Sequence, residues 1–467
     1  MQRKNFIKLA LAFPIGFATR PFLWLMNNNS DFVSNANVSY YKKGDADYEL
    51  LRKGFNKRIN KFPKIIARCN NEAGVAEAIQ LANKNGLPIA VKSGGHCMEG
   101  FSCNNNGMVI NLSALNTIEF IDKNTIRVGP ACTLSKIYDV LLPLNKIIPG
   151  GSCAGVGIGG LTLGGGYGLL ARKFGLTCDS LQSITMIDGK GNIVSSENDA
   201  ALLWACKGGN NGNFGVVSSM TFKLHDAPAT MQSFKFRSFN VTVEKAKSIL
   251  ENWFELTKQL PESCFSAFVL NHKTLYILLT NTGKHTAQLQ NIISGLSVIN
   301  DKSTQSIKLP LSKALKNYYG RQYPLYFKNA SAGLYKDFAT ISGCIEDAFK
   351  IVTTTPGMIY QVNTLGGNIQ KSEFEIASSF PHRAYIYFSE LQTYWEQPKQ
   401  EAGLLNNFQQ VQEVFINHGI KAQYRNYPDI NFKNWPEFYY SKNYKKLQQI
   451  KLKYDPDNSF RYEQSLK

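Results

Sequence analysis

The spacing of apolar and polar residues predicts a series of short helices and strands in the first half of the chain. Residues 70–86 (NNEAGVAEAIQLANKNG) carry apolar side chains at helical spacing, with an asparagine cap before them and a glycine stop after them. Residues 133–142 (TLSKIYDVLL) predict a second helix. The runs PIAVKSGG, GMVINLSAL and TIRVGPAC predict strands, and SITMIDGKGNIV predicts a β-hairpin that turns at DGKG.

The pattern of predicted helices and strands changes at about residue 229 and again at about residue 419. Between these points the runs TMQSFKFRSF, CFSAFVLN, TLYILLTN and AYIYFSELQTYW are aromatic-rich strands with helices between some of them. They predict a second domain, an antiparallel sheet with helices on one face. The last stretch, SKNYKKLQQIKLKY, is helical and basic, and we expect its lysines to face solvent.

Glycine is concentrated in residues 149–168, where it occupies ten of twenty positions. Each glycine costs about 0.5–1 kcal/mol of helix or strand stability relative to alanine, but it permits positive φ and close backbone approach. A large group is therefore expected against this backbone. The alternative, that the glycines only turn tightly packed loops, stays open.

Two further patterns refine the nature of that group. Gly155, Gly157 and Gly160 satisfy the GxGxxG pattern of nicotinamide-dinucleotide sites, but that site needs a buried strand directly before it, and Pro149-Gly-Gly-Ser breaks strands. The pattern is therefore a poor indicator here. The loop KSGGHC at 92–97 follows an apolar run, and its successive N–H groups suit a diphosphate.

Composition narrows the class of protein. The chain has 467 residues, of which 43% are hydrophobic and 18% charged, which is globular and allows two or three domains. The net charge of +18 favours acidic partners, yet no nucleic-acid recognition pattern is present, so we expect no nucleic-acid partner. The nine cysteines form no CxxC pair, and we expect no metal site.

The N-terminus has the layout of an export signal. Arg3 and Lys4 precede an apolar stretch, in an order that also resembles an imperfect twin-arginine signal. Lys8, Pro14 and Arg20 interrupt this stretch, so a membrane span is not expected. We expect a periplasmic or secreted protein; the alternative is an ordinary N-terminal helix and a cytoplasmic location.

Five motifs together identify a family resemblance. They are SGGH at 93–96, PGGSCAGVGIGGLTLGGGYGLLARKFGLTCD at 149–179, LWACKGGNNGNFGVV at 203–217, YRNY at 424–427 and KYDPDNSF at 453–460. On these motifs the chain resembles the berberine-bridge-enzyme-like flavoprotein oxidases of the vanillyl-alcohol-oxidase/p-cresol-methylhydroxylase superfamily.

The resemblance implies an α+β fold in which the FAD-binding domain has two parts. Residues 37–228 and the C-terminal segment 419–467 would form that domain, and residues 229–418 would form an inserted substrate domain of antiparallel sheet covered by helices. Residues 1–36 would be leader and linker.

The resemblance also implies FAD contacts and, in part of the family, two covalent bonds to the flavin. His96 and Cys153 occupy the two attachment positions, and an imidazole nitrogen and a thiolate are both good nucleophiles for an electron-poor ring. The chain departs from the family pattern at Lys92, where arginine is usual, and at Cys97, where a small polar residue is usual. The other expected cofactor contacts are Lys92, Ser93, Gly94, Gly95, Cys97, Ser102, Gly151, Val156, Gly157, Gly159, Gly160, Thr162, Gly165, Gly168, Leu169, Gly215, Val217 and Asn426.

Hydride transfer from an alcohol carbon needs a base for the hydroxyl proton. The resemblance points to Tyr424 as this base, with Asn426 nearby. A tyrosine needs help to ionise, and Arg425, Arg383 and His382 are candidates between which the sequence does not choose.

Substrate contacts are expected on the run AYIYFSELQTYW. Its side chains alternate between two faces, with Tyr387 on one face and Glu390, Gln392 on the other. Either Tyr387 or the Glu390/Gln392 pair would touch substrate, and we include Tyr387 among the catalytic candidates.

These observations predict an FAD-dependent oxidoreductase. It would transfer a hydride from an alcohol or hemiacetal carbon, in a substrate such as an oligosaccharide, to bicovalently bound FAD, and oxygen would reoxidise the flavin to give hydrogen peroxide. Val156 is small enough to leave room for oxygen. The alternatives are a tailoring oxidase of an aromatic or peptide metabolite, and a flavin-bearing binding protein without turnover. A monomer is expected.

Overall fold

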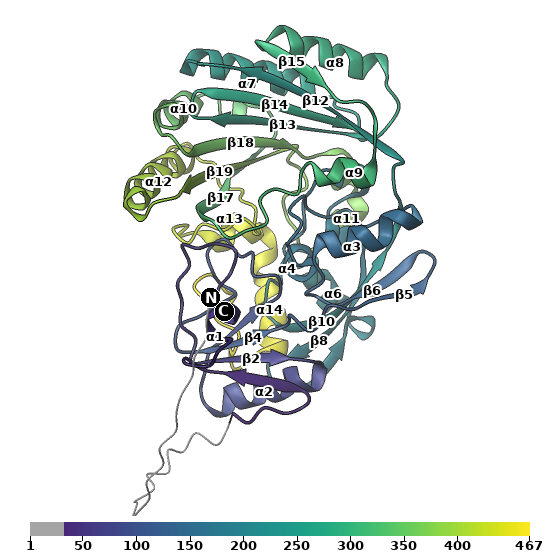
Figure 1. Cartoon of the computed structure of the whole chain (residues 1–467), viewed down its shortest axis with the longest axis vertical. Coiled ribbons are helices and arrows are strands. Elements are labelled where there is room, and N and C mark those ends of the chain that lie inside the picture. Colours follow the sequence, from purple (N-terminus) through teal and green to yellow (C-terminus); the bar gives the residue numbers. More distant parts are fainter. Residues whose placement is uncertain (1–31) are drawn as a thin grey trace, which may run out of the picture.

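A computed structural model describes residues 32–467, which form two parts stacked one on the other (Figure 1). The predicted export signal falls almost entirely on residues outside this range. Among the described residues, no helix has both the length and the apolar character needed to span a membrane.

The first sheet is formed by the N-terminal part of the described chain. Its strand order is β1-β2-β4-β3, with β4 parallel to both β2 and β3. The elements are β1 (Val38–Tyr41), α1 (Tyr48–Arg52), β2 (Ile65–Cys69), α2 (Glu72–Lys84), β3 (Ile89–Lys92) and β4 (Met108–Asn111). Helix α2 is the predicted helix, and the Asn71 side chain caps it by accepting a hydrogen bond from the Gly74 N–H at 2.9 Å.

A second, five-stranded sheet has the order β5-β6-β10-β8-β9. Strands β8 and β9 form the predicted hairpin, and a short pair of strands, β7 and β11, lies beside this sheet. The strands are β5 (Ile118–Asp122), β6 (Thr125–Val128), β7 (Lys146–Ile147), β8 (Leu181–Asp188), β9 (Ile193–Ser195), β10 (Gly215–Lys223) and β11 (His225–Asp226). The helices are α3 (Leu134–Leu141), α4 (Ile158–Leu163), α5 (Ala171–Phe174) and α6 (Ala200–Cys206).

The glycine-rich segment contains one short helix, α4, although its composition disfavours helix. Two of its six residues are glycines, and Gly159 has a packing role, since a Cβ there would lie 2.8 Å from the Cβ of Pro130. Glycine at position 159 therefore lowers the helix propensity of α4 but permits the close contact with Pro130.

The inserted part is an eight-stranded sheet in which every neighbouring pair is antiparallel, as predicted. Its main path is β15-β12-β14-β13-β18-β19-β17, and β16 pairs with β12. The strands are β12 (Thr230–Ser238), β13 (Cys264–Asn271), β14 (Thr274–Asn281), β15 (Lys302–Gln305), β16 (Leu309–Pro310), β17 (Tyr326–Tyr335), β18 (Met358–Thr364) and β19 (Tyr387–Trp395).

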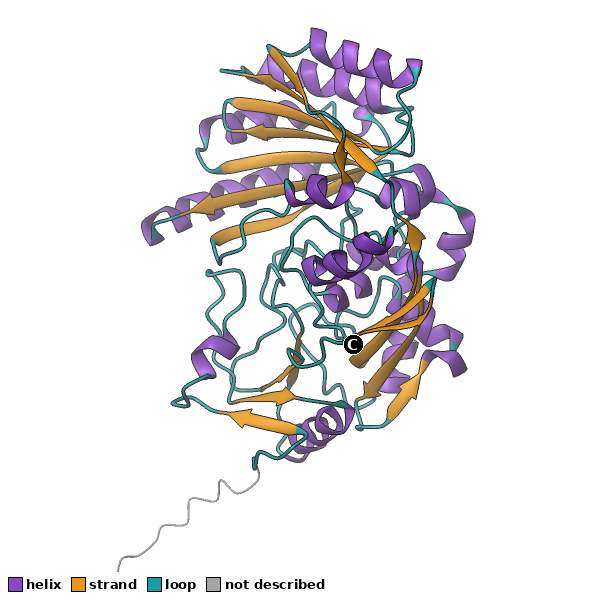
Figure 2. Cartoon of the chain, turned by 45° about the vertical axis from the view of Figure 1, so that its right-hand side comes forward, coloured by secondary structure: helices purple, strands orange, loops and turns teal. Residues whose placement is uncertain are grey.

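Helices cover one face of this sheet, the face turned away from the FAD-binding part (Figures 1 and 2). The covering helices are α7 (Val243–Thr257), α8 (Ala287–Val298), α10 (Ile345–Thr354) and α12 (Glu401–Asn417); α9 (Leu311–Lys316) and α11 (Ser372–Ala377) are shorter. Trp253, Phe268, Tyr360 and Phe415 belong to the core between helices and sheet, and each is fully buried. Because strand side chains alternate, the residues between these face the other part of the molecule.

The C-terminal segment returns to the FAD-binding part, as expected. Helices α13 (Trp435–Tyr440) and α14 (Tyr444–Tyr454) pack in its core, and the Ile89 N–H of β3 donates to the Ser459 carbonyl at 2.9 Å. The lysines of α14 do not all face solvent as expected. Lys451 is buried, because it pairs with Asp455 at 2.5 Å and donates to two backbone carbonyls.

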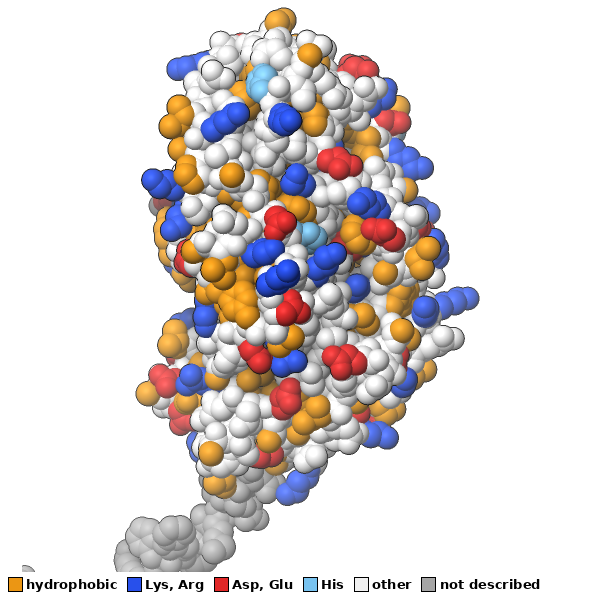
Figure 3. Space-filling model, turned by 90° about the vertical axis from the view of Figure 1, so that its right-hand side faces the viewer, with side chains coloured by type: hydrophobic (Ala, Val, Ile, Leu, Met, Phe, Trp, Pro, Cys, Tyr) orange, Lys and Arg blue, Asp and Glu red, His pale blue; other side chains and the backbone are white. Residues whose placement is uncertain are grey.

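The surface carries both signs of charge. Figure 3 shows lysine and arginine side chains spread over one face, with aspartates and glutamates among them. On that face the excess positive charge of the chain is thus distributed rather than gathered into one block.

Candidate active site

A cavity of about 1210 Å³ lies where the two parts of the molecule meet. One wall is the glycine-rich wall, made by the loops at 93–97 and 149–168. The opposite wall is the sheet wall, made by the uncovered face of the eight-stranded sheet. The volume exceeds the roughly 300–1,000 Å³ of ordinary ligand pockets, so a dinucleotide and a substrate have room together.

The glycine-rich wall is built by loops that touch through their backbones. A Cβ on Gly94 would lie 2.4 Å from the Gly157 nitrogen, and one on Gly157 would lie 2.5 Å from the Ser93 oxygen. No larger residue fits at either position without moving backbone. The wall therefore presents main-chain N–H groups and little side chain, which fits a large flat cofactor with a diphosphate.

Most of the residues expected to contact the cofactor line this cavity. They are Ser93, Gly94, Gly95, His96, Cys97, Ser102, Gly151, Cys153, Val156, Gly157, Gly159, Gly160, Gly168, Leu169, Gly215, Val217 and Asn426.

Lys92, Thr162 and Gly165 were also expected to contact the cofactor, but they lie outside the cavity lining. The Lys92 ammonium donates to the carbonyl of Leu51 at 2.6 Å and to that of Lys53, and burial lowers its pKa to about 8. The Thr162 hydroxyl donates to the Ile158 carbonyl within α4. Gly165 has φ +115° and forms the turn after that helix.

The His96 side chain lies in the cavity as a neutral imidazole. Its ring stacks on Phe55 with centroids 4.4 Å apart and planes 17° apart. Burial lowers the pKa of His96 to about 4, so at neutral pH the ring carries no charge. One ring nitrogen then keeps a lone pair for bond formation.

Cys153 faces the open space of the same cavity and is exposed. Burial raises the pKa of its thiol, and the negative charge of Glu390 raises it further. The exposure of the side chain and the raised pKa are compatible, because Cys153 is exposed to the inside of the cavity and the surrounding protein atoms desolvate its sulfur. At neutral pH Cys153 is therefore a protonated thiol.

Tyr424 does not lie in the cavity lining. Its buried hydroxyl accepts hydrogen bonds from the Gly166 and Tyr167 N–H groups at 3.0 and 3.2 Å and from the Asn426 amide at 3.1 Å. Burial raises its pKa to about 12 despite these donors. The three donors favour the ionised form of the hydroxyl and burial opposes it, so the role of Tyr424 as base stays a prediction. Its hydroxyl also ties the C-terminal segment to the glycine-rich wall.

Two of the three residues proposed to assist Tyr424 interact with other groups. Arg383 is paired with buried Asp179 at 2.6 Å, and the His382 ring bonds to the Phe438 carbonyl at 2.9 Å. Arg425 lines the cavity, but its guanidinium donates to the hydroxyls of Tyr440 and Tyr462.

The prediction that Tyr387 contacts substrate is wrong, because its side chain lies on the helix-covered face of β19. Its hydroxyl donates to the Phe254 carbonyl at 2.9 Å, and its ring packs on Phe254 with centroids 4.2 Å apart. Glu390 and Gln392, on the opposite face of the same strand, line the cavity. The alternation was predicted correctly, and of the two open choices Glu390 and Gln392 are the residues that face the cavity.

Glu390 is an acidic residue of the sheet wall. Its carboxylate accepts hydrogen bonds from the Asn329 and Asn363 amides at 3.0 and 3.1 Å. Burial raises the pKa of Glu390 above its ordinary value, although these donors act in the other direction. A carboxyl with a raised pKa is suited to accept and release a proton near neutral pH.

Two tyrosines stand close to Glu390 in the same cavity. Tyr427 and Tyr167 line it, and for both the Glu390 charge adds to burial in raising the pKa. Asn329 adds a free acceptor, because its Oδ1 atom is buried without a hydrogen-bond partner. Such an orphaned oxygen at a cavity wall fits a hydroxyl donor from a ligand.

The sequence alone did not single out most of the sheet wall. The residues involved alternate along the strands: Phe265, Ala267, Val269 and Asn271 on β13, Tyr276 and Leu278 on β14, Ile359, Gln361 and Asn363 on β18, and Tyr394 on β19. That alternation is the signal that could have found them. Phe55, which stacks on His96, lies in a segment without any motif, and no signal marked it.

Comparisons with known proteins define the class. A family described as "FAD binding domain" matches residues 63–197, and one described as "Berberine and berberine like" matches residues 423–467. These matches and the glycine-lined cavity indicate an FAD-linked oxidoreductase. In the described residues, no cluster of three or more His, Cys, Asp or Glu side chains could hold a metal ion.

The relatives identify the family. The chain is 31% identical over 444 residues to YgaK of Bacillus subtilis, an uncharacterised FAD-linked oxidoreductase, covering 91% of this chain and 95% of the relative. The chain belongs to the berberine-bridge-enzyme-like family of FAD-linked oxidoreductases.

Solved structures share the whole fold. A glycopeptide hexose oxidase, solved with teicoplanin, has a TM-score of 0.84 and 25% identity, over 93% of this chain and all (100%) of that one. A chitooligosaccharide oxidase has a TM-score of 0.83 and 23% identity, over 92% and 97% of the two chains.

Proposed function

We propose that this protein is an FAD-dependent oxidase that converts a CH–OH group of a sugar or sugar-bearing substrate to a carbonyl. The alcohol or hemiacetal loses a hydride from carbon and a proton from oxygen, and dioxygen takes up the hydride and that one proton to leave as hydrogen peroxide. FAD supplies the hydride acceptor and the route to oxygen. The residues below bind the substrate and move its proton.

The observation that carries the proposal is Glu390, a buried carboxyl with a raised pKa on a cavity wall that faces the cofactor loops. In its ionised form it accepts the hydroxyl proton as the carbon loses its hydride. Asn329 and Asn363 hold the carboxylate, and the free Oδ1 of Asn329 would accept a hydrogen bond from a second substrate hydroxyl. Tyr427 and Tyr167 would position the reacting oxygen.

The sheet wall supports a sugar substrate. It combines aromatic side chains with uncharged amides, including Tyr276, Tyr394, Gln361 and Gln392. Aromatic faces pack on the C–H faces of sugar rings, and amides exchange hydrogen bonds with hydroxyls. The glycopeptide hexose oxidase with the same fold acts on a hexose by its name, which supports the same class.

We further propose that FAD is bound covalently through His96 and Cys153. Both side chains line the same cavity. The neutral His96 imidazole has a lone pair for bond formation, whereas the Cys153 thiol must first lose its proton, and Glu390 is the nearby carboxylate that would receive it. Each bond would replace a C–H bond of the flavin, and oxygen, the proposed electron acceptor, would take up the two electrons that each replacement releases. The predicted export and monomeric state stay predictions.

The test begins with the intact mass and visible spectrum of acid-denatured protein. An added mass of one FAD, retained by the single variants His96→Ala and Cys153→Ala and lost from the double variant, would support both bonds. Protein of bare polypeptide mass after expression with ample FAD would refute them.

A peroxide-coupled screen then tests the reaction. Hexoses and neutral oligosaccharides form one arm, and aromatic alcohols form the other. Peroxide in the sugar arm supports the proposal, and peroxide in the aromatic arm alone favours a tailoring oxidase. Flavin that no substrate in either arm reduces would contradict turnover.

A further inference from the structure

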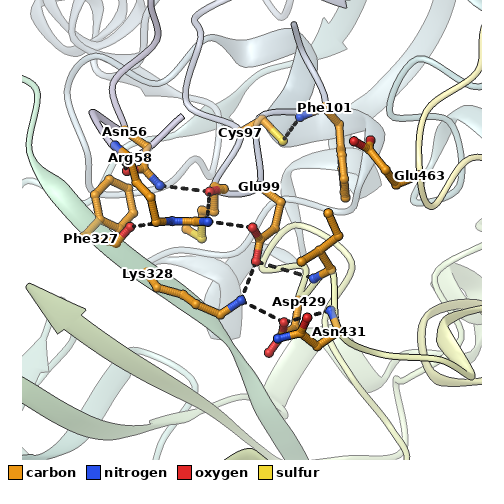
Figure 4. A network of polar contacts seen from close by, with 12 residues as sticks. Asn56, Arg58, Cys97, Glu99, Phe101, Phe327, Lys328, Asp429, Asn431 and Glu463 are labelled. Carbon is orange, nitrogen blue, oxygen red and sulfur yellow. Dashed lines mark hydrogen bonds and ion pairs between the residues drawn. The ribbon is translucent and has the colours of Figure 1, made fainter. Parts of the chain in front are cut away.

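A buried cluster of four charged side chains joins segments far apart in the sequence. Arg58 and Lys328 are the cations, and Glu99 and Asp429 are the anions (Figure 4). Arg58 lies 2.6 Å from Glu99, and Lys328 lies 2.8 Å from both Glu99 and Asp429. The side chains of Glu99, Lys328 and Asp429 are at most 5% exposed.

The cluster contains equal numbers of cationic and anionic side chains. Burial alone would raise the pKa of Glu99, but Lys328 and Arg58 hold it below its ordinary value. Burial alone would lower the pKa of Lys328, but Asp429 and Glu99 hold it above its ordinary value. A buried ion network contributes little net stability compared with apolar packing, so what it adds here is a fixed arrangement of its segments.

Glu99 fixes the loop that carries His96. The two residues are three positions apart, in the run His96-Cys-Met-Glu. The Met98 carbonyl between them accepts hydrogen bonds from Asn56 and from Arg58. The loop that faces the cofactor is therefore attached to the cluster at two adjacent residues.

Lys328 fixes the edge strand of the sheet wall. Strand β17 is the last of its sheet, and Lys328 precedes Asn329, the residue that donates to Glu390. The two side chains point to opposite faces, Lys328 toward Phe408 of α12 and Asn329 into the cavity. Any shift of the backbone at Lys328 therefore moves Asn329 and, through it, Glu390.

Asp429 fixes the segment that carries Tyr427. Its second oxygen accepts from Gln412, and its backbone accepts from Gln464, so it is held on several sides. The same segment runs along β17, where the Ser331 N–H donates to the Tyr427 carbonyl at 2.8 Å.

We propose that Lys328 is a positioning residue: by joining Glu99 to Asp429 beneath strand β17, it sets the His96 loop at a fixed separation from Glu390, the proposed proton acceptor, and from Tyr427. The inference rests on the proposed function for its kinetic consequence. Its structural consequence, the placement of the flavin against the sheet wall, does not depend on which substrate is oxidised.

The test is the double variant Lys328→Met/Asp429→Asn in the full-length holoprotein. It removes one charge of each sign and leaves the Arg58–Glu99 pair, so no buried charge is left unpaired. The matched control is Lys451→Met/Asp455→Asn, which removes a buried pair that is 1% and 0% exposed and lies outside the cavity lining. Asp429→Asn alone is the milder variant if the double variant does not fold.

We expect kcat of the Lys328 variant to fall by about 10- to 100-fold with KM within about threefold, because the reacting groups are misaligned and not removed. The visible circular dichroism of the bound flavin should change as well. The control should lose thermal stability and keep kcat and the flavin spectrum.

A Lys328 variant with the kcat and flavin spectrum of the control would overturn the inference, since the cluster would then only stabilise the fold. A wild-type protein that oxidises no substrate would refute the proposed function, and the flavin spectrum would still decide the role of Lys328.

Discussion

Replacing Glu390 with glutamine should abolish most of the activity and leave the fold intact. Glutamine has the same shape but cannot accept the substrate proton. Loss of a positioned general base costs about 10²- to 10⁴-fold in rate, which is roughly 3–5 kcal/mol of transition-state stabilisation at 1.36 kcal/mol per tenfold. We therefore expect kcat to fall by this factor with little change in KM.

The structure also predicts how stability responds. In the wild type both neighbours of Glu390 donate amide N–H groups to it, so a glutamine NH₂ would face one donor. Asn329 can turn its amide and offer the Oδ1 atom that now has no partner. The variant thus keeps two hydrogen bonds, each contributing about 1 kcal/mol.

The sign of the pH dependence follows from the raised pKa. Folding raises the pKa of Glu390 above its unfolded value, so the wild type loses stability as pH rises through the folded-state pKa, whereas the variant does not titrate there. The melting temperature of Glu390→Gln relative to wild type should therefore increase with pH above the ordinary glutamate range and then level off.

The measurements are the anaerobic rate of flavin reduction by substrate, followed in a stopped-flow instrument, and the melting temperature across about pH 4 to 9. Activity within tenfold of wild type would refute the role of Glu390 as base. A variant whose relative stability falls as pH rises would refute the buried, desolvated carboxyl. Leu391→Val, the next residue of β19 and part of the core beneath the helices, serves as a control for general disturbance of the strand.

Three other predictions use single residues. Because the pKa of His96 is about 4, the rate of flavin attachment to His96 in apoprotein, followed by mass, should be unchanged between pH 6 and 8. Tyr424→Phe should reduce kcat by less than about tenfold and lower the free energy of unfolding by about 1–3 kcal/mol, measured by denaturant titration, because two buried N–H groups lose their acceptor. A loss of activity as large as that of Glu390→Gln would instead identify Tyr424 as the base. Gly157→Ala should give protein without flavin absorbance, since its Cβ would lie 2.5 Å from the Ser93 oxygen, and normal flavin content would contradict the proposed packing.

Local patterns in the sequence predicted the elements well. The asparagine cap of α2, the β8–β9 turn and the alternation along β19 each depend on neighbouring residues only, and all were observed. The motifs likewise predicted most of the glycine-rich wall.

Placement that depends on distant partners was not predictable in the same way. Both faces of β19 carry polar and aromatic side chains, so alternation could not tell that Tyr387 faces helix α7 and Glu390 the cavity. In the sequence, Lys451 is indistinguishable from an exposed helical lysine. Only the folded structure shows that it pairs with Asp455 and donates to two backbone carbonyls. The pairing of Glu99 with Lys328 spans 229 positions and has no local sign.

The two walls of the cavity come from different parts of the chain, and this has a consequence for how such a protein can change. On β18 and β19, Tyr360 and Leu391 belong to the core beneath the helices, while Gln361 and Gln392 face the cavity. Mutations at the cavity-facing positions leave that core in place, and they leave the glycine-rich wall untouched. New substrates can therefore be acquired one strand position at a time, while cofactor chemistry and folding are inherited unchanged.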